Sequence, residues 1–171
     1  TDDIDWLSDR GGTGSGSTGP GGSLPNPSTS GTDHTLGTGA GTYLYAEGSG
    51  TGVGFPGMTA RLISPAMDLS GATGAGVEFW YHMLGDTMGT LHVDVEILGT
   101  GLITDVVMPW TDNQDLWQEA VVDLSPYAGE QIRVIIRGVT GSSFTSDMAI
   151  DDISLYEILD NDVGVVSLDA P

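Results

Sequence analysis

Two adjacent carboxylates stand out among the residues that could do chemistry, because an apolar segment surrounds them. Asp151 and Asp152 interrupt the run 148–155, which otherwise reads as a strand. Neighbouring residues of a strand face opposite sides of a sheet, so we expect one of the two carboxylates to point toward the core. A buried carboxylate needs a cation or several hydrogen-bond donors. The pair therefore predicts either a site for a hard cation, or one solvated carboxylate beside one that is bonded to the backbone.

The other reactive side chains form no known catalytic motif. His34, His82 and His92 are 48 and 10 residues apart, and none belongs to a His-Glu-x-x-His zinc pattern. The sequence has neither a cysteine nor a Gly-x-Ser-x-Gly elbow that could supply a nucleophile. With 24 acidic residues, some carboxylates will meet at glycosidase spacing by chance, so such a pair carries no signal. We predict that the chain is not an enzyme.

The charge of the chain excludes several classes of partner. It has 24 acidic residues, only 4 basic ones and a formal net charge of -20. Nucleic-acid binding requires positive charge, so we expect no nucleic-acid partner. No run of 18 apolar residues is present, so we expect no membrane insertion. An acidic surface of this kind suits an extracellular, calcium-containing medium.

In the segments that must position these residues, apolar and polar side chains alternate with a period of two. Leu91, Val93, Val95 and Ile97 alternate with polar residues and predict a half-buried strand. Further strands are predicted over residues 43–46, 61–63, 77–83, 117–124, 131–139 and 148–158. A hairpin-like loop is predicted over 85–89, and helical turns over 115–117 and 125–128. Many short strands with Gly/Pro turns between them indicate an all-β sandwich or barrel.

Two segments lie outside this strand pattern. Residues 11–42 are dominated by Gly, Ser, Thr and Pro, which predicts a flexible linker or a long loop wrapped on the sandwich. Residues 159–171 read as a linker followed by the start of a further module. We therefore expect the chain to be a piece of a longer protein.

The order of short motifs along the chain resembles one family. The motifs are Asp5-Trp6, Thr18-Gly19-Pro20, Asp33-His34-Thr35, Gly41-Thr42-Tyr43-Leu44-Tyr45, Ala60-Arg61-Leu62-Ile63-Ser64-Pro65, Phe79-Trp80-Tyr81-His82-Met83-Leu84-Gly85 and Ala149-Ile150-Asp151-Asp152-Ile153-Ser154-Leu155. In this order they resemble the MAM domain, named from meprin and receptor tyrosine phosphatase mu, over about residues 2–157. The resemblance implies an antiparallel jelly-roll sandwich of two sheets that is extracellular, non-catalytic and used in adhesion and oligomerisation.

The resemblance also implies a domain boundary, an origin and a cation site. The domain would span residues 1–158. The family usually opens one strand earlier, with a Phe-Glu pair that this chain lacks, so a missing first strand and a missing cation ligand stay open. Animal members carry disulfides, whereas this chain has no cysteine, which points to a secreted bacterial version. The family places Asp33 in a loop and holds a structural cation where the first and last strands meet. Asp33, Asp151 and Asp152 are therefore the predicted calcium ligands.

Two functions remain as alternatives. The first is a calcium-stabilised adhesion or interaction module of a larger secreted or cell-surface bacterial protein, which binds another protein or a neighbouring module. The second is a carbohydrate-binding module attached to a polysaccharide-degrading enzyme. Jelly-roll sandwiches often bind glycans through exposed aromatic side chains, and Trp6, Trp110 and Tyr127 are the candidates here.

Overall fold

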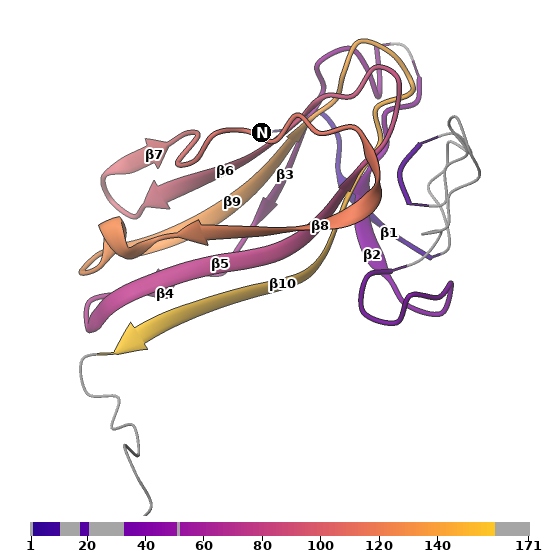
Figure 1. The fold of residues 1–171 in the computed structure, drawn as a ribbon. Helices are drawn as coiled ribbons and strands as arrows, with labels where there is room; N and C mark the ends of the chain where they lie inside the picture. Colours follow the sequence, from indigo (N-terminus) through magenta and orange to yellow (C-terminus); the bar gives the residue numbers. More distant parts are fainter. Residues whose placement is uncertain (1, 11–17, 21–32, 51, 160–171) are drawn as a thin grey trace, which may run out of the picture.

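Short strands make up the regular structure of this protein (Figure 1). The computed structural model describes residues 2–10, 18–20, 33–50 and 52–159. Within these ranges the strands are β1 (Trp6–Asp9), β2 (Tyr43–Ala46), β3 (Thr59–Ile63), β4 (Met67–Asp68), β5 (Ala72–Met83), β6 (Thr90–Ile97), β7 (Gly101–Ile103), β8 (Gln114–Asp123), β9 (Gln131–Val139) and β10 (Met148–Leu159). A single-turn 3₁₀ helix, η1 (Ser125–Tyr127), precedes β9. None of the helices found in these ranges is long and apolar enough to cross a membrane.

The strands form two antiparallel sheets that face each other (Figure 1). The first sheet has the order β1-β2-β10-β5-β8. The second has the order β3-β9-β6-β7, and β4 also pairs with β9. The closing strand β10 therefore lies in the middle of the first sheet, between β2 and β5. The prediction of an all-β, antiparallel jelly-roll sandwich of two sheets is confirmed.

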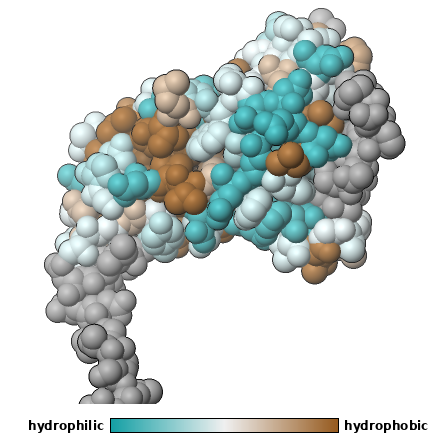
Figure 2. Space-filling model, in the orientation of Figure 1, coloured by the Kyte–Doolittle hydropathy of each residue, from teal (hydrophilic) through white to brown (hydrophobic). Residues whose placement is uncertain are grey.

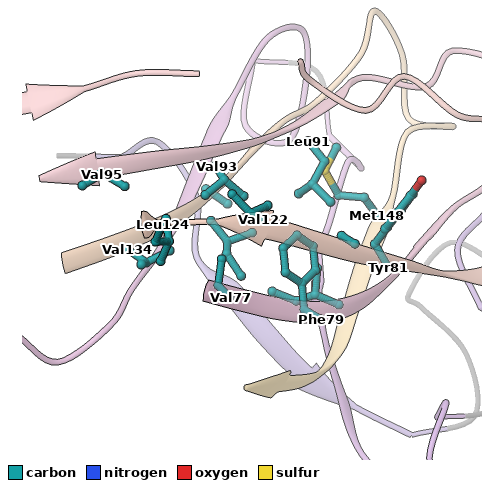
Figure 3. Close-up of a cluster of buried hydrophobic side chains, with 14 of the residues drawn as sticks. Val77, Phe79, Tyr81, Leu91, Val93, Val95, Val122, Leu124, Val134 and Met148 are labelled. Atoms are coloured by element: carbon teal, nitrogen blue, oxygen red, sulfur yellow. The ribbon is translucent and has the colours of Figure 1, made fainter. Parts of the chain in front are cut away.

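The core lies between the sheets and follows the predicted alternation (Figure 3). Residues at every second position of β5, β6, β8 and β9 point inward, because successive side chains of a strand face opposite sides. Figure 3 shows these side chains meeting across the space between the sheets. The fully buried members include Val77, Phe79, Leu91, Val93 and Met148. Strand β5 contributes more buried residues to the first sheet's inner face than any other strand.

Two expectations about local structure are wrong. The loop over 85–89 joins β5 to β6, which lie in different sheets, so it is a crossing between sheets and not a hairpin. Gly85 and Gly89 are required there, since a Cβ would lie 2.2 Å from the carbonyl oxygen of Thr145 and 1.9 Å from that of Val139. The helical turn predicted over 115–117 is part of β8, whereas the one over 125–128 is confirmed as η1.

Three short strands were not predicted from the sequence. In addition, parts of two predicted segments lie outside the described residues. Strands β1, β4 and β7 span only two to four residues, and β1 (WLSD) and β7 (GLI) show no alternation of apolar and polar side chains. Of the predicted linker 159–171, only Leu159 is described, and it ends β10. Of the tract 11–42, the described residues 33–41 form a series of turns that leads into β2.

Candidate functional site

Three predicted cation ligands meet where the loop 33–36 reaches β10. The backbone N–H of His34 donates to Oδ2 of Asp151 at 2.8 Å. The imidazole Nδ1 of His34 lies 2.7 Å from Oδ2 of Asp152, and the hydroxyl of Thr35 donates to Oδ1 of the same carboxylate. Asp33 is buried next to them and accepts a hydrogen bond from the N–H of Leu36. We call residues 33–36 together with Asp151 and Asp152 the loop–strand junction.

A β-bulge explains how two adjacent carboxylates reach the same loop. The pairing of β10 with β5 shifts register between Asp151 and Ser154, and Asp152 has a φ of 48°. This left-handed backbone breaks the alternation of sides. The expectation that one carboxylate points toward the core is therefore wrong, because both bind His34 in the loop.

The two carboxylates of the junction differ in their electrostatic surroundings. Burial raises the pKa of Asp151, and the negative charges of Asp152 and Asp33 raise it further. Hydrogen bonds from His34 and Thr35 instead hold the pKa of Asp152 below its usual value. Asp151 is therefore the carboxylate whose charge a bound cation would stabilise most.

Asp33 provides an oxygen that suits a cation. Its Oδ1 is buried and has no hydrogen-bond partner among the described residues. The carboxylate fits against Gly41, where a Cβ would lie 1.9 Å from Cγ of Asp33. Any larger residue at position 41 would therefore displace the carboxylate.

The junction supplies some, but not all, of the ligands that a calcium ion needs. Asp33 offers an oxygen that has no hydrogen-bond partner among the described residues. The two oxygens of Asp151 already accept from the backbone N–H groups of His34 and Asp152, and both oxygens of Asp152 are bonded to His34 and Thr35. Across the described ranges, no three His, Cys, Asp or Glu side chains are grouped so that they could hold a metal ion alone. Calcium accepts backbone carbonyls and water as ligands besides carboxylates, so a site here would need both.

Aromatic rings cover the outer face of the first sheet beside the junction. The ring of His34 stacks on Trp80 of β5, with centroids 3.7 Å apart and planes 13° from parallel. Trp117 of β8 contacts His82 edge-on at 5.5 Å and Tyr43 at 5.9 Å. His82 is fully buried, and its Nε2 lies 3.2 Å from Oδ1 of Asp115. This burial lowers the pKa of His82 to about 4.

A second polar cluster lies on the outer face of the second sheet. Arg137 of β9 binds Asp94 of β6 through Nε at 2.6 Å and a terminal nitrogen at 3.1 Å, and it also reaches Asp105. Burial opposes the charge of Asp94, but the hydrogen bonds from Arg137 and from the N–H of Asp105 outweigh it and lower the pKa of Asp94. His92 lies between Thr90 and Asp105, with 2.6 Å on each side.

The three predicted glycan-binding aromatics lie on separate elements. Trp6 is on β1, Trp110 follows β7, and Tyr127 is in η1. All three are half-buried and pack against the core. Trp110 contacts Phe79 and Tyr81 at 5.7 and 5.6 Å, and its backbone pairs with Leu91.

Asp147 is an important residue that the sequence analysis missed. Its carboxylate is fully buried just before β10. It accepts hydrogen bonds from the hydroxyl of Thr18 at 2.6 Å and the N–H of Gly48 at 2.7 Å. The carboxylate thus ties two segments distant in sequence to the closing strand. The sequence does contain one signal for this residue, which is an aspartate directly before an apolar strand. The signal is weak because an aspartate at such a position is usually exposed to solvent.

The family follows from the sequence match along this fold. The family model described as "MAM domain, meprin/A5/mu" matches residues 2–158, which include every described strand except the last residue of β10. The chain belongs to the MAM domain family. The resemblance found in the sequence motifs is thereby confirmed.

Curated relatives of this MAM domain are large animal proteins. The chain is 38% identical over 120 residues to MAM domain-containing glycosylphosphatidylinositol anchor protein 1 of Gallus gallus, covering 70% of this chain and 12% of that protein. It is 34% identical over 132 residues to Neuropilin-1a of Danio rerio, covering 75% of this chain and 13% of that protein. The chain thus spans only about an eighth of these relatives. The prediction of an extracellular or cell-surface location is confirmed, in keeping with the membrane anchor named in the first relative.

Solved structures show the same kind of sandwich at low similarity. The structure titled TmCBM61 in complex with β-1,4-galactotriose has a TM-score of 0.44 and 16% identity, covering 68% of this chain and 70% of that one. The K3 cleaved adhesin domain of Lys-gingipain from Porphyromonas gingivalis has a TM-score of 0.45 and 17% identity, covering 88% and 90%. Similarity at this level carries no functional argument.

Proposed function

We propose that this MAM domain is a non-catalytic adhesion or interaction module of a larger secreted or cell-surface bacterial protein, stabilised by calcium. MAM domains are adhesion and interaction modules, and the sequence match places the chain among them. The bacterial origin is supported by the absence of cysteine from a family whose animal members carry disulfides. The partner is another protein or a neighbouring module of the same protein.

The main support for a non-catalytic function is that the histidines have structural roles. All three histidines of the chain pair with an aspartate from another element. His34 joins the loop 33–36 to β10, and His82 joins β5 to β8. His92 joins β6 to the segment after β7. Each pair holds two parts of the fold together, which is a structural use of the side chains that most often serve as general bases.

One of these pairs needs a direct test, because its geometry resembles a hydrolase triad. Thr90, His92 and Asp105 are linked in the order hydroxyl, imidazole and carboxylate. In this protein the carboxylate of Asp105 also accepts from Arg137, and its backbone N–H donates to Asp94. The proposal expects that a fluorophosphonate probe will not label the folded chain. Labelling that disappears in Thr90→Val would show a reactive hydroxyl and contradict the non-catalytic function.

Calcium is proposed to bind at the loop–strand junction. The buried Oδ1 of Asp33 and the carboxylate of Asp151 would supply ligands, and Asp152 would hold the loop in place through His34 and Thr35. The ion would offset the burial, and the repulsion from Asp152 and Asp33, that raise the pKa of Asp151. Its role would be to stabilise the folded state, because a ligand that binds only the native form shifts the unfolding equilibrium.

Carbohydrate binding is the alternative function. It is tested with a glycan array and polysaccharide pull-down on the wild-type chain and on Trp110→Ala. Binding of a polysaccharide at micromolar affinity, lost in Trp110→Ala but kept in a variant of an exposed apolar residue such as Met108→Ala, would favour this alternative. Because Trp110 packs on Phe79 and Tyr81, a melting curve must show that the variant is folded.

A further inference from the structure

An apolar groove runs along the second half of β10. Its central cavity, of about 220 Å³, opens between the sheets, with Leu62, Ile63 and Pro65 on one side and Ile153 and Leu155 on the other. A second hollow shares Ile153 and extends back to residues 150–152. A third shares Leu155 and extends to Tyr156 and Asp68. The three hollows therefore follow one another along the strand.

Both walls of this groove are strand edges that the described residues leave open. Strand β10 pairs with β2 only over Met148, Ala149 and Ile150, and from Ser154 to Leu159 it pairs only with β5. The left half of β10 in Figure 1 accordingly has a neighbouring strand on one side only. Strand β3 pairs with β9 on one side, and on its other side the described residues 2–4 reach only Thr59, Ala60 and the backbone N–H of Arg61, which donates to Asp2. An open edge presents unpaired N–H and C=O groups that can bind a further strand.

The groove has the dimensions and lining of a seat for an extended peptide. The regular edge beyond the bulge covers the five residues from Ser154 to Ile158, because the register shifts again before Leu159. At about 3.3 Å per residue this corresponds to a strand of roughly 17 Å. Ile63 and Ile153 are 53% and 39% exposed, so they offer apolar surface to alternate side chains of such a strand.

We propose that this groove binds an extended strand of a partner protein, with apolar side chains at alternate positions and basic residues at its ends. The inference rests on the proposed interaction function and specifies the segment that is recognised. The basic ends follow from the charges beside the groove, which are Asp152 at one end and Asp68 at the other.

Charge also decides against a second copy of this chain as the occupant. Pairing of two β10 edges would bring together two molecules that each carry a net charge of -20. Such repulsion opposes association, whereas a basic strand is attracted. Self-association is therefore an outcome that the experiment must be able to detect.

The experiment measures binding of a fluorescent, capped peptide of about eight residues, with alternating Val and Thr and a Lys at each end, a length set by the strand rise. The whole 171-residue chain is used, with fluorescence anisotropy as the readout. We expect saturable binding that weakens at least about tenfold in Ile153→Asn, because a polar side chain then enters the apolar groove. Asp68→Asn should weaken binding less and reduce its dependence on salt. Val121→Asn, at an exposed apolar position of β8 outside the groove, is the matched control and should bind normally.

Two further measurements keep the result unambiguous. The peptide should slow hydrogen exchange of those amides between Ser154 and Tyr156 that point away from β5. A peptide with N-methylated backbone nitrogens should neither bind nor protect them. Absence of binding, equal loss in the Val121→Asn control, protection of these amides in the free chain, or a dimer in sedimentation would each overturn the inference. None of these results bears on the proposed function, which the fluorophosphonate and polysaccharide experiments decide separately.

Discussion

The imidazole of His34 lies flat on the indole of Trp80, 3.7 Å away, while the backbone N–H of His34 donates to Asp151. One loop residue thus contacts two neighbouring strands of the first sheet, β5 and β10. Its ring nitrogen also reaches Asp152. The contact connects the long N-terminal part of the chain to the closing strand, and it defines the loop–strand junction as a structural anchor.

Removing the ring of His34 should loosen this anchor. His34→Ala loses the stack on Trp80 and the bond to Asp152. An aromatic pair contributes about 0.5–1.5 kcal/mol beyond its buried area, so we expect a loss of about 1–2 kcal/mol in the free energy of unfolding. The measurement is urea denaturation. Leu36→Ala, at an exposed position of the same loop, should change the stability little. Equal effects of the two variants would contradict the stack.

The stability of the fold should fall as the pH drops from 6.5 toward 4. In this range His82 stays neutral in the folded state but takes up a proton in the unfolded chain. Burial lowers its pKa to about 4 from an ordinary 6.5, so the unfolded chain binds the proton more tightly between these values. By linkage the contribution of His82 is complete above pH 6.5 and is lost as the pH falls toward 4. The loss would reach about 3 kcal/mol at most, at 1.36 kcal/mol per pH unit.

The His82 effect is checked by urea denaturation at intervals of pH between 7 and 4. In His82→Gln, which keeps a polar group near Asp115 but cannot gain a proton, the slope over this range should flatten. An unchanged slope in the variant would mean that other groups cause the acid sensitivity.

Calcium should stabilise the wild-type chain at neutral pH. At a concentration one hundredfold above its dissociation constant, a bound ion adds roughly 2.7 kcal/mol. Thermal unfolding with calcium and with chelator measures this gain. The gain should vanish in Asp33→Asn and in Asp151→Asn. It should also fall at a pH below the raised pKa of Asp151, because that carboxylate is then protonated. A midpoint that chelator leaves unchanged in the wild type would rule out the ion.

Breaking the buried ion pair of the second sheet should be costly. Arg137→Met leaves the carboxylate of Asp94, which is 1% exposed, without its guanidinium partner. Loss of one member of a buried pair typically costs about 3–5 kcal/mol. The double variant Arg137→Met with Asp94→Leu should recover much of this loss, as measured by urea denaturation. A double variant no more stable than Arg137→Met would contradict the pairing argument.

The long strands and the sandwich were predictable because alternation extends over many residues. Strand β9 has the predicted bounds, and β6 and β10 differ from their predictions by only one residue. Figure 2 shows a large apolar patch on the left half of the visible face and smaller apolar groups among the hydrophilic residues of the right half, so outward-facing residues are not all polar. Strand β7 has only three residues and could not be recognised.

The details of the candidate site were less predictable. Sequence reasoning found Asp33, Asp151 and Asp152, but it assumed regular alternation in β10. The bulge at Asp152 depends on a positive φ, which is uncommon for a residue other than glycine and which the apolar run around Asp152 does not indicate. The roles of Trp80 and Asp147 also depend on residues far apart in the sequence, such as His34 and Thr18. No local pattern encodes such contacts.

The central claim is that the carboxylates of the closing strand anchor the loop 33–36 to the first sheet. Its most direct test is NMR hydrogen exchange at the backbone amide of His34, which donates to Asp151. We expect slow exchange in the wild type and exchange at least about tenfold faster in Asp151→Ala, a change of about 1.4 kcal/mol in local opening. The amide of Val93, in the core of the second sheet, should be much less affected. Equal exchange at His34 in both proteins would contradict the claim.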